Sequence, residues 1–341
     1  MVILGSGGAR IVVAKQVRAS GGIWLSLAGI RFLLDPGPGA LVKMTGSRHH
    51  LDPTKLDAIL LSHRHLDHSG DVNNMIEAMT MGGTAPRGRL FAPADALDGD
   101  DPVVLKYLRP FLTQVVTLKE GGEYELGQVR FSCPVRHQHR GEVYGFRFET
   151  GRSQKLEART QSAEVQTGNA QQGFETGRSQ KLEARVQSAE GEERGRSQKS
   201  EGRIQNAEVQ TPALDPSIPL SLYPSLSLSY IADTRYFAEL AEHYKADVVI
   251  MNVVRPQASN LDHLSAPDAE ELVKVIRPKL AVLSHFGMKM LTARPWVVAR
   301  EMSERTGCKV VAASDGMLVD LEQLKATIPN SQLPIPNAGE A

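Results

Sequence analysis

Apolar runs in the first part of the chain alternate with polar turns in a way that predicts strands and helices in succession. Residues 23–27, 30–34 and 57–61 are short apolar runs rich in Ile and Leu, and such runs are typical of buried strands. Residues 11–17 are rich in β-branched side chains, so we expect another strand there. Residues 71–81 begin with an acidic residue and place apolar side chains at helical spacing, which predicts a helix.

The second part of the chain repeats this alternation. Its apolar runs predict strands over residues 226–232, 248–253 and 280–283, and helical spacing predicts helices over residues 236–244 and 266–276. Two α/β segments of this kind favour two mixed sheets packed face to face, with helices on their outer sides. The predicted fold class is therefore α/β, with a four-layer αββα sandwich.

Residues 148–211 interrupt this pattern with an internal repeat. The run that begins at Phe148 returns almost unaltered at Phe174, and a third, eroded copy follows. The copies hold few large apolar side chains and no apolar stripe, so they are not expected to form a core of their own. We therefore predict one domain made of residues 1–147 and 212–341, carrying a repetitive low-complexity insertion that is exposed or disordered. A functional interaction arm is the alternative interpretation of the repeats.

Composition and charge limit the class of protein and its partners. The chain has 341 residues, 41% of them hydrophobic, which is enough for one large α/β domain. Its 39 basic and 39 acidic residues cancel, so no overall charge favours RNA or an anionic membrane, although RNA is not excluded as a partner. Two cysteines are too few for a disulfide framework and fit a reducing cytoplasm. With neither a secretion signal nor about 18 consecutive apolar residues, we expect a cytoplasmic protein without a membrane segment.

A dense set of candidate metal ligands follows the predicted strand at residues 57–61. The set consists of three imidazoles and one carboxylate within six residues, namely His63, His65, Asp67 and His68. These are the ligand types that hold zinc, manganese or iron in hydrolytic sites, and on one loop they can face two adjacent ions. Surface histidines are the alternative, but this spacing is expected by chance in only about one chain in a few thousand. The cluster therefore predicts a metal site.

Two later strand ends carry matching side chains. His285 follows the strand at residues 280–283 in the order Leu-Ser-His, as His63 follows its own strand. Asp233 follows the strand at residues 226–232 and supplies a carboxylate able to bridge two ions. A His or Asp at a strand end is usually a cap or turn residue, but beside a histidine cluster each is favoured as a ligand.

The order of these motifs resembles the metallo-β-lactamase superfamily. The shared order is His-x-His-x-Asp-His, a later His, an Asp after a strand and a final Ser/Thr-His-Phe, and it covers nearly all of the chain outside the insertion. The run Phe-Leu-Leu-Asp-Pro-Gly at residues 32–37 resembles the early strand of the superfamily, in which the Asp, here Asp35, supports the site from behind. The glycine-rich run at residues 5–8 lacks the Lys-Ser/Thr of a phosphate-binding loop, so we expect a turn near the site there.

Within the superfamily, the ribonuclease Z and phosphodiesterase branch is the most similar. Residues 139–147, His-Arg-Gly-Glu-Val-Tyr-Gly-Phe-Arg, resemble the branch motif His-x-x-Glu-x-Tyr-Gly-Tyr-Arg, whose first His is a metal ligand. The resemblance selects His139 over His137, which we expect to be a polar loop residue. His263 resembles the branch histidine that contacts the scissile phosphate and assists the leaving group. Without the family, His263 beside a Ser-x-x-Asp capping box is equally a helix-entry residue.

The resemblance implies a complete ligand set for two divalent ions, with zinc expected first and manganese or iron as alternatives. One ion would be held by His63, His65 and His139, the other by Asp67, His68 and His285, with Asp233 bridging them. Two such ions share a water, hold the resulting hydroxide for attack and neutralise charge on a phosphoryl or carbonyl oxygen. Asp67 and His263 are the candidate catalytic residues, Asp67 because it can also orient that hydroxide.

Departures from the branch limit the substrate. The interval before Asp233 holds the repeats instead of a flexible tRNA-binding arm, and Asn252-Val253-Val254-Arg255 stands where the branch commonly has a Glu-containing motif. We therefore do not expect tRNA processing. The first hypothesis is a metal-dependent phosphodiesterase acting on a nucleotide or a small organic phosphodiester. The alternatives are a lactone or thioester hydrolase and a non-catalytic binding module, and a homodimer is compatible with each.

Overall fold

The computed structural model describes residues 1–150 and 226–325. These residues belong to one compact unit, and within them the strands form two mixed sheets of seven and eight strands. The predicted insertion, residues 148–211, lies outside the described residues from position 151 onward. Its first three positions complete a strand of the second sheet, so the folded domain reaches beyond the predicted boundary at residue 147.

The first sheet takes most of its strands from the first part of the chain. In order across the sheet they are β15 (Met317–Leu318), β1 (Val2–Ile3), β2 (Ile23–Leu27), β3 (Ile30–Leu34), β4 (Ala58–Leu60), β5 (Arg89–Ala92) and β6 (Gln114–Thr117). Pairing is antiparallel from β15 to β3 and parallel from β3 to β6. The accompanying helices are α1 (Arg10–Ala14), α2 (Ala40–Thr45), α3 (Leu66–Ser69), α4 (Val72–Met79) and α5 (Ala94–Leu97), with 3₁₀ turns at Pro53–Lys55 and Lys106–Phe111.

The second sheet combines strands from both sides of the insertion. In order they are β14 (Val310–Ala312), β13 (Leu280–Ser284), β11 (Val248–Arg255), β10 (Ser227–Ile231), β9 (Phe146–Thr150), β8 (Val129–Cys133) and β7 (Gly122–Leu126), with β12 (Leu264–Ser265) paired to β11. Pairing is parallel from β14 to β10 and antiparallel from β10 to β7. The helices of this half are α7 (Leu240–His243), α8 (Ala266–Ile276), α9 (Met288–Thr292), α10 (Pro295–Thr306) and α11 (Glu322–Lys325).

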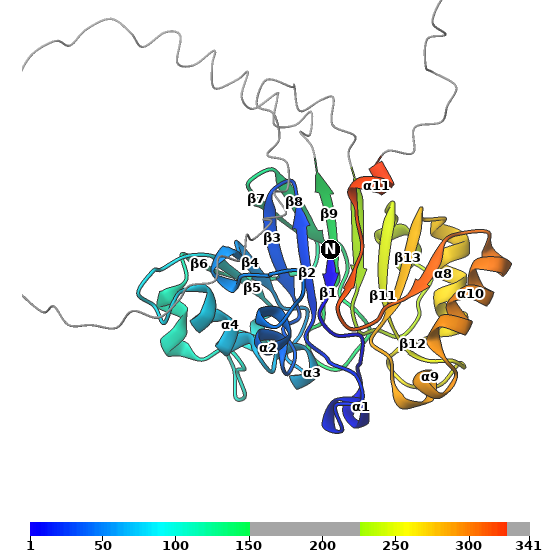
Figure 1. The fold of residues 1–341 in the computed structure, drawn as a ribbon, viewed down its shortest axis with the longest axis horizontal. Helices are drawn as coiled ribbons and strands as arrows, with labels where there is room; N and C mark the ends of the chain where they lie inside the picture. The colour runs from blue at the N-terminus through cyan, green and yellow to red at the C-terminus, as the bar shows by residue number, and fades with distance from the viewer. Residues whose placement is uncertain (151–225, 326–341) are drawn as a thin grey trace, which may run out of the picture. The chain divides into compact units, whose positions relative to one another are not determined.

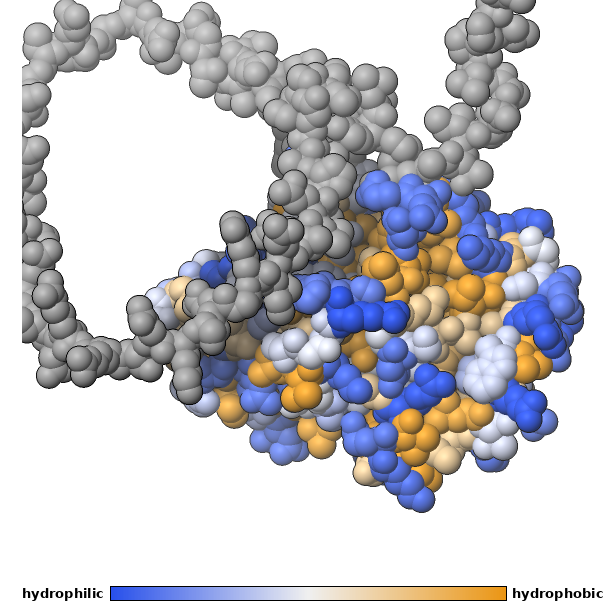
Figure 2. Space-filling view, in the orientation of Figure 1, coloured by the Kyte–Doolittle hydropathy of each residue, from blue (hydrophilic) through white to orange (hydrophobic). Residues whose placement is uncertain are grey.

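The two sheets lie in the middle of the unit, with α2 and α4 outside the first and α8 and α10 outside the second (Figure 1). The predicted αββα sandwich is thus confirmed. Hydrophilic residues dominate the exposed side of α10 (Figure 2), which has 12 residues and is the longest helix in the described ranges. Among the described residues, no helix has both the length and the apolar character needed to cross a membrane.

Alternation within the central strands explains the layers. On β3, Phe32 and Leu34 are buried in the core between the sheets, whereas Leu33 packs in the second core, beneath α2 and α4. Successive side chains of a strand point to opposite faces, so a parallel strand covered on both faces must be apolar throughout. Phe32 also contacts Phe148 of the other sheet, with ring centroids 5.5 Å apart. Aromatic packing across the gap therefore joins the two sheets that carry the site.

The predicted strand at residues 11–17 is wrong, because this segment forms α1 and a turn. The amide of Val13 donates to the carbonyl oxygen of Ala9, and Ile11 and Val17 are exposed. β-Branched composition favours a strand only where a partner strand and a buried face are available, and here β1 already pairs with both of its neighbours. The helix predicted over residues 236–244 is shorter than expected, since only Leu240–His243 is α-helical.

Candidate metal centre

The candidate site lies where four parallel strands end. Asp35 directly follows β3 and His285 directly follows β13, whereas His63 comes three positions after the end of β4 and Asp233 two positions after the end of β10. The carboxyl ends of parallel strands form the usual binding edge of such sheets. Asp35 and His285 leave their strands in left-handed backbone conformations, with φ of 49° and 61°, and these conformations turn both side chains toward the site.

A single helical turn arranges the histidine cluster. The helix α3 begins directly after His65, and the amide of His68 donates to the carbonyl oxygen of His65 over 2.9 Å. The hydroxyl of Ser69 donates to the carbonyl oxygen of Arg64 over 3.0 Å and holds the turn against the preceding loop. Because the turn is short, Asp67 and His68 project from one end of the helix toward the ends of the strands.

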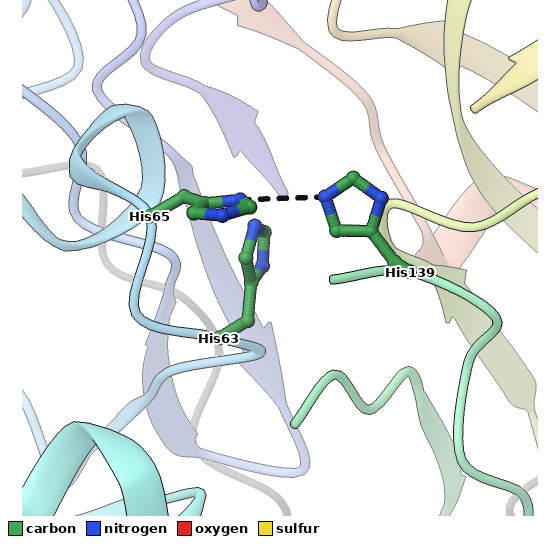
Figure 3. A group of neighbouring side chains, drawn as sticks. All are labelled: His63, His65 and His139. Carbon is green, nitrogen blue, oxygen red and sulfur yellow. Dashed lines mark hydrogen bonds between the residues drawn. The ribbon is translucent and has the colours of Figure 1, made fainter. Parts of the chain in front are cut away.

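The structure brings together all seven residues predicted to bind metal. Their ligand atoms form groups in which all atoms lie within 4.8 Å of one another. The groups in the described residues are His63, His65 and His139; Asp67, His68 and His285; His63, His68 and Asp233; and His139, Asp233 and His263. Figure 3 shows the first group, in which two rings from the loop after β4 and the ring of His139 from a separate segment point toward one another, with His139 Nε2 at 3.3 Å from His65 Nδ1.

Asp233 occupies the middle of these groups. Its Oδ2 lies 3.5 Å from His68 Nε2 and 3.3 Å from His263 Nε2, and its Oδ1 lies 3.6 Å from His285 Nδ1. Asp67 approaches the same region, with Oδ2 at 3.3 Å from His285 Nε2. A carboxylate with each oxygen facing a different set of imidazoles is well placed to bridge two ions.

The hydrogen-bonding pattern of the histidines fits metal ligation. Three of them have one ring nitrogen paired away from the centre: His63 Nδ1 pairs with Ser62 Oγ, His68 Nδ1 with Asp35 Oδ2 and His139 Nδ1 with the carbonyl oxygen of Asp262, over 2.7–2.9 Å. The inward Nε2 atoms of His63 and His68, and both ring nitrogens of His285, are buried and have no hydrogen bond to any described residue. Leaving such an atom unpaired costs about 1–3 kcal/mol, whereas coordination of an ion would satisfy it.

Burial acts to lower the pKa values of four histidine ligands, whereas nearby carboxylates act to raise them. Burial lowers the pKa of His63 well below 6.5, and it also lowers the pKa of His65 and of His139. Burial opposes the charged form of His68 too, but the carboxylates of Asp233, Asp67 and Asp35 outweigh it and raise its pKa well above 6.5. The centre therefore stabilises positive charge while most of its imidazoles stay neutral, as a cation site requires.

Asp233 and Asp67 both remain ionised despite their burial. Burial favours the neutral form of each, but His285 and His68 outweigh it and hold the pKa of Asp233 well below its usual range. In the same way, His68 and His285 lower the pKa of Asp67. Both carboxylates are thus available to a cation at neutral pH.

Several contributions to the site were absent from the sequence analysis. His137, expected as a polar loop residue, is instead buried, with Nε2 2.8 Å from the hydroxyl of Tyr244, and burial lowers its pKa to about 4. The glycine-rich turn does lie at the site, since a Cβ on Gly8 would fall 2.2 Å from the His285 ring. Asp315 anchors this turn by accepting from the amide and hydroxyl of Ser6 over 2.8–2.9 Å. Asp315 lies in no motif, so nothing in the sequence indicated it.

Comparison with known proteins tests the predicted family. The family model of the beta-lactamase superfamily domain matches residues 30–156, a range that includes the histidine cluster and His139. The metallo-beta-lactamase fold protein YhfI from Bacillus subtilis superposes with a TM-score of 0.58 and 14% identity, over 93% of this chain and 96% of YhfI. The chain therefore has the metallo-β-lactamase fold, and its residues 30–156 match the beta-lactamase superfamily domain.

Other superfamily folds agree with this assignment. A diphosphatase from the PhnP family superposes with a TM-score of 0.52 and 16% identity, over 93% of this chain and 94% of that one. The short form of human tRNase Z superposes with a TM-score of 0.50 and 15% identity, over 94% of this chain and 98% of that one. The uncharacterized protein MJ1374 of Methanocaldococcus jannaschii is 24% identical over 328 residues, 94% of each chain. The chain therefore has the predicted class, a metal-binding hydrolase of the metallo-β-lactamase fold, and is similar in fold to ribonuclease Z.

Proposed function

We propose that this protein is a phosphodiesterase that hydrolyses a nucleotide or a small organic phosphodiester with the help of two divalent ions. Zinc is the ion that we expect first. The observation that carries the proposal is the position of His263 beside the ligands. Its Nε2 lies 3.3 Å from Oδ2 of Asp233, while its side chain keeps 23% of its surface exposed. An imidazole that contacts both solvent and the candidate bridging carboxylate can reach a substrate held at the ions.

The ligand sets follow the groups that the structure assembles. His63, His65 and His139 would hold one ion; Asp67, His68 and His285 the other; and Asp233 would lie between them. Two ions held there would lower the pKa of a water and neutralise charge on a phosphoryl oxygen. Asp35 supports the ligand His68 on the side away from the centre, because its Oδ2 accepts from His68 Nδ1 over 2.9 Å.

His263 would donate a proton to the leaving group, whereas Asp67 would orient the attacking water. Burial lowers the pKa of His263, but its hydrogen bond to Asp233 outweighs burial and raises the pKa above 6.5. A His263 that is protonated near neutral pH can donate to the leaving oxygen of a phosphodiester. Asp67 is ionised and 18% exposed, so it can accept a hydrogen bond from the attacking water and orient it.

The similar structures support phosphate chemistry. The names diphosphatase and tRNase both denote cleavage of phosphate linkages, and both proteins share the fold of this chain over most of its length. Neither name carries tRNA itself to this chain, because the net charge of zero provides no overall attraction for a polyanion. A small phosphodiester therefore remains the proposed substrate, and RNA is a weaker proposal.

Zinc binding should release protons, which tests the ligand set without a substrate. The raised pKa keeps His68 protonated at pH 7, so coordination must displace roughly one proton from it. Competition from that proton should weaken as the pH rises through the pKa of His68, and zinc should therefore bind more tightly at higher pH. Calorimetric titrations in buffers of different ionisation enthalpy measure the release. Binding without any proton release at pH 7 would contradict a protonated His68 in the metal-free protein.

Substituting His263 tests the catalytic role. We expect His263→Ala to reduce turnover of a phenyl phosphodiester of a nucleotide by about 10²- to 10⁴-fold, because the leaving phenolate needs a proton. The loss should be smaller for the p-nitrophenyl analogue, whose leaving group is a weaker base. His243→Ala on α7 is the matched control, since His243 lies outside all the ligand groups found in the described residues.

The outcomes of this experiment separate the alternatives. Equal losses on both phosphodiesters would exclude the proton-donor role of His263. Turnover confined to lactones or thioesters in a parallel panel would overturn the phosphodiesterase in favour of an acyl hydrolase, since the same ions polarise a carbonyl. A zinc-loaded protein inactive on every ester would favour a binding module instead.

A further inference from the structure

A chain of buried hydrogen bonds joins the two sheets behind the metal ligands. The hydroxyl of Tyr230 donates to Asp35 Oδ2 over 2.7 Å and accepts from the side-chain amide of Asn252 over 3.2 Å. The same amide nitrogen donates to Asp233 Oδ1 over 2.9 Å. Asp35 ends a strand of the first sheet, whereas Tyr230 and Asn252 belong to β10 and β11 of the second. The chain thus runs from one sheet to the other and ends on the candidate bridging carboxylate.

Only an amide suits the position of Asn252. Asp233 Oδ1 can only accept, and the Tyr230 oxygen must accept because its hydrogen already goes to Asp35. The two hydrogens of one amide nitrogen satisfy both acceptors. All four side chains are at most 4% exposed, so water does not replace these bonds. The amide of Asn252 thus has a defined role within the run at residues 252–255, where the sequence departs from the Glu-containing motif of the branch.

At its other end, this chain of hydrogen bonds reaches Asp35, which holds Ser62 and the candidate ligand His68. Asp35 Oδ1 accepts from the amide of Ser62 over 2.7 Å, and Oδ2 accepts from His68 Nδ1 over 2.9 Å and from the Ser62 hydroxyl over 2.7 Å. A continuous path of hydrogen bonds therefore connects His68 on α3 to Asp233, which comes just after β10. Both ends of the path are candidate metal ligands, and none of the three residues between them belongs to a ligand group found in the described residues.

We infer that Asn252 and Tyr230 are positioning residues that hold Asp233 in the orientation of a bridging ligand. With Oδ1 fixed by Asn252, Oδ2 is directed at His68 and His263, 3.5 Å and 3.3 Å away. Without that bond, the carboxylate would be free to rotate about its last side-chain torsion and would be less well placed to hold an ion. The inference rests on the proposed metal centre and is independent of the substrate.

Metal binding by variants of the metal-free protein tests this inference. Asn252→Leu keeps the approximate volume and removes both hydrogen bonds, and Tyr230→Phe removes one oxygen atom. We expect Asn252→Leu to weaken zinc binding by about 10- to 100-fold, and Tyr230→Phe to shift it in the same direction by less. Visible spectra of the Co²⁺-substituted proteins should change as well, because they report ligand geometry, which a loss of global stability alone would not alter.

Ser229→Ala is the matched control. Ser229 is fully buried on the same strand as Tyr230, and as its neighbour it points to the opposite face of the sheet. Its hydroxyl has no hydrogen-bond partner in the part of the chain that the structure describes, so its removal should leave zinc affinity and the Co²⁺ spectrum unchanged. Thermal unfolding of each metal-free variant shows whether it is folded, and Tyr230→Phe alone decides the outcome if Asn252→Leu does not fold.

The outcomes separate this inference from the proposed function. If the unsubstituted protein binds two ions and hydrolyses phosphodiesters while the folded variants bind zinc and Co²⁺ as it does, the inference is overturned and the function stands. If the variants lose affinity as expected but no protein hydrolyses a phosphodiester, the function fails and the positioning role stands. An unsubstituted protein that binds one ion only would overturn the bridging orientation itself.

Discussion

Asp233→Asn is expected to lower the zinc content from two ions to at most one and to reduce phosphodiester turnover by more than about 100-fold. The neighbouring histidines keep Asp233 ionised, so the substitution removes one full negative charge from between the proposed ions. Asparagine retains the oxygen that accepts from Asn252, and the local structure should therefore survive. The loss should exceed the 10- to 100-fold typical of removing a ligand's hydrogen-bond partner, because a bridging ligand serves both ions.

Metal analysis after dialysis and initial rates at saturating zinc would measure both effects. Asp247→Asn is the control, because Asp247 precedes β11 and therefore lies at the end of the sheet opposite to Asp233. There it accepts from the amide and hydroxyl of Ser227 and pairs with Lys279, so its loss should change stability without changing metal content. Two tightly bound ions in Asp233→Asn, with normal turnover, would exclude a bridging role for Asp233.

Gly8→Ala is expected to weaken zinc binding by at least about 10-fold through displacement of His285. The added Cβ would fall 2.2 Å from the His285 ring, much closer than van der Waals contact allows. The turn has little room to retreat, because the amide of Gly8 donates to the carbonyl oxygen of Phe286 and the turn is held further back by Asp315. The imidazole must therefore move away from Asp67, its neighbour at 3.3 Å.

A double-mutant cycle isolates this effect. If Gly8→Ala acts through His285, it should change zinc affinity little when His285 is already alanine, since no ring remains to be displaced. Calorimetric zinc titration of the two single variants and the double variant gives the coupling. Equal losses in both backgrounds would show instead that the glycine-rich turn acts on the site by another route.

The strand-end ligands could be predicted because their signal is local. His63 and His285 each follow an apolar run directly in the order Leu-Ser-His, and Asp233 closes another run in the same way. Parallel strands place such ends at one edge of each sheet, and packing of the two sheets in a sandwich brings the two edges together, so the pattern along the chain was enough to anticipate the meeting of these side chains. The sandwich was predictable for the same reason, because strands such as β3 and β4 are apolar on both faces.

The supporting contacts could not be predicted because they join distant segments through single atoms. Tyr230 and Asp35 are 195 positions apart and are linked by one hydrogen bond, and no motif marks either Tyr230 or Asn252 as its partner. The helix at residues 10–14 was missed because local composition favoured a strand that no neighbour was free to pair with. Both cases depend on which segments meet in space, which residue pattern alone does not specify.

The left-handed backbone at Asp35 and His285 implies a trade-off between stability and function. For a residue with a side chain this conformation costs roughly 1–2 kcal/mol, and glycine would relieve the cost at either position. Glycine, however, supplies neither the carboxylate behind His68 nor the imidazole beside Asp67. The metal-free fold is thus less stable than the same backbone allows, and ligand binding restores stability by mass action. The melting temperature of this protein should therefore follow the free zinc concentration and fall in the presence of a chelator.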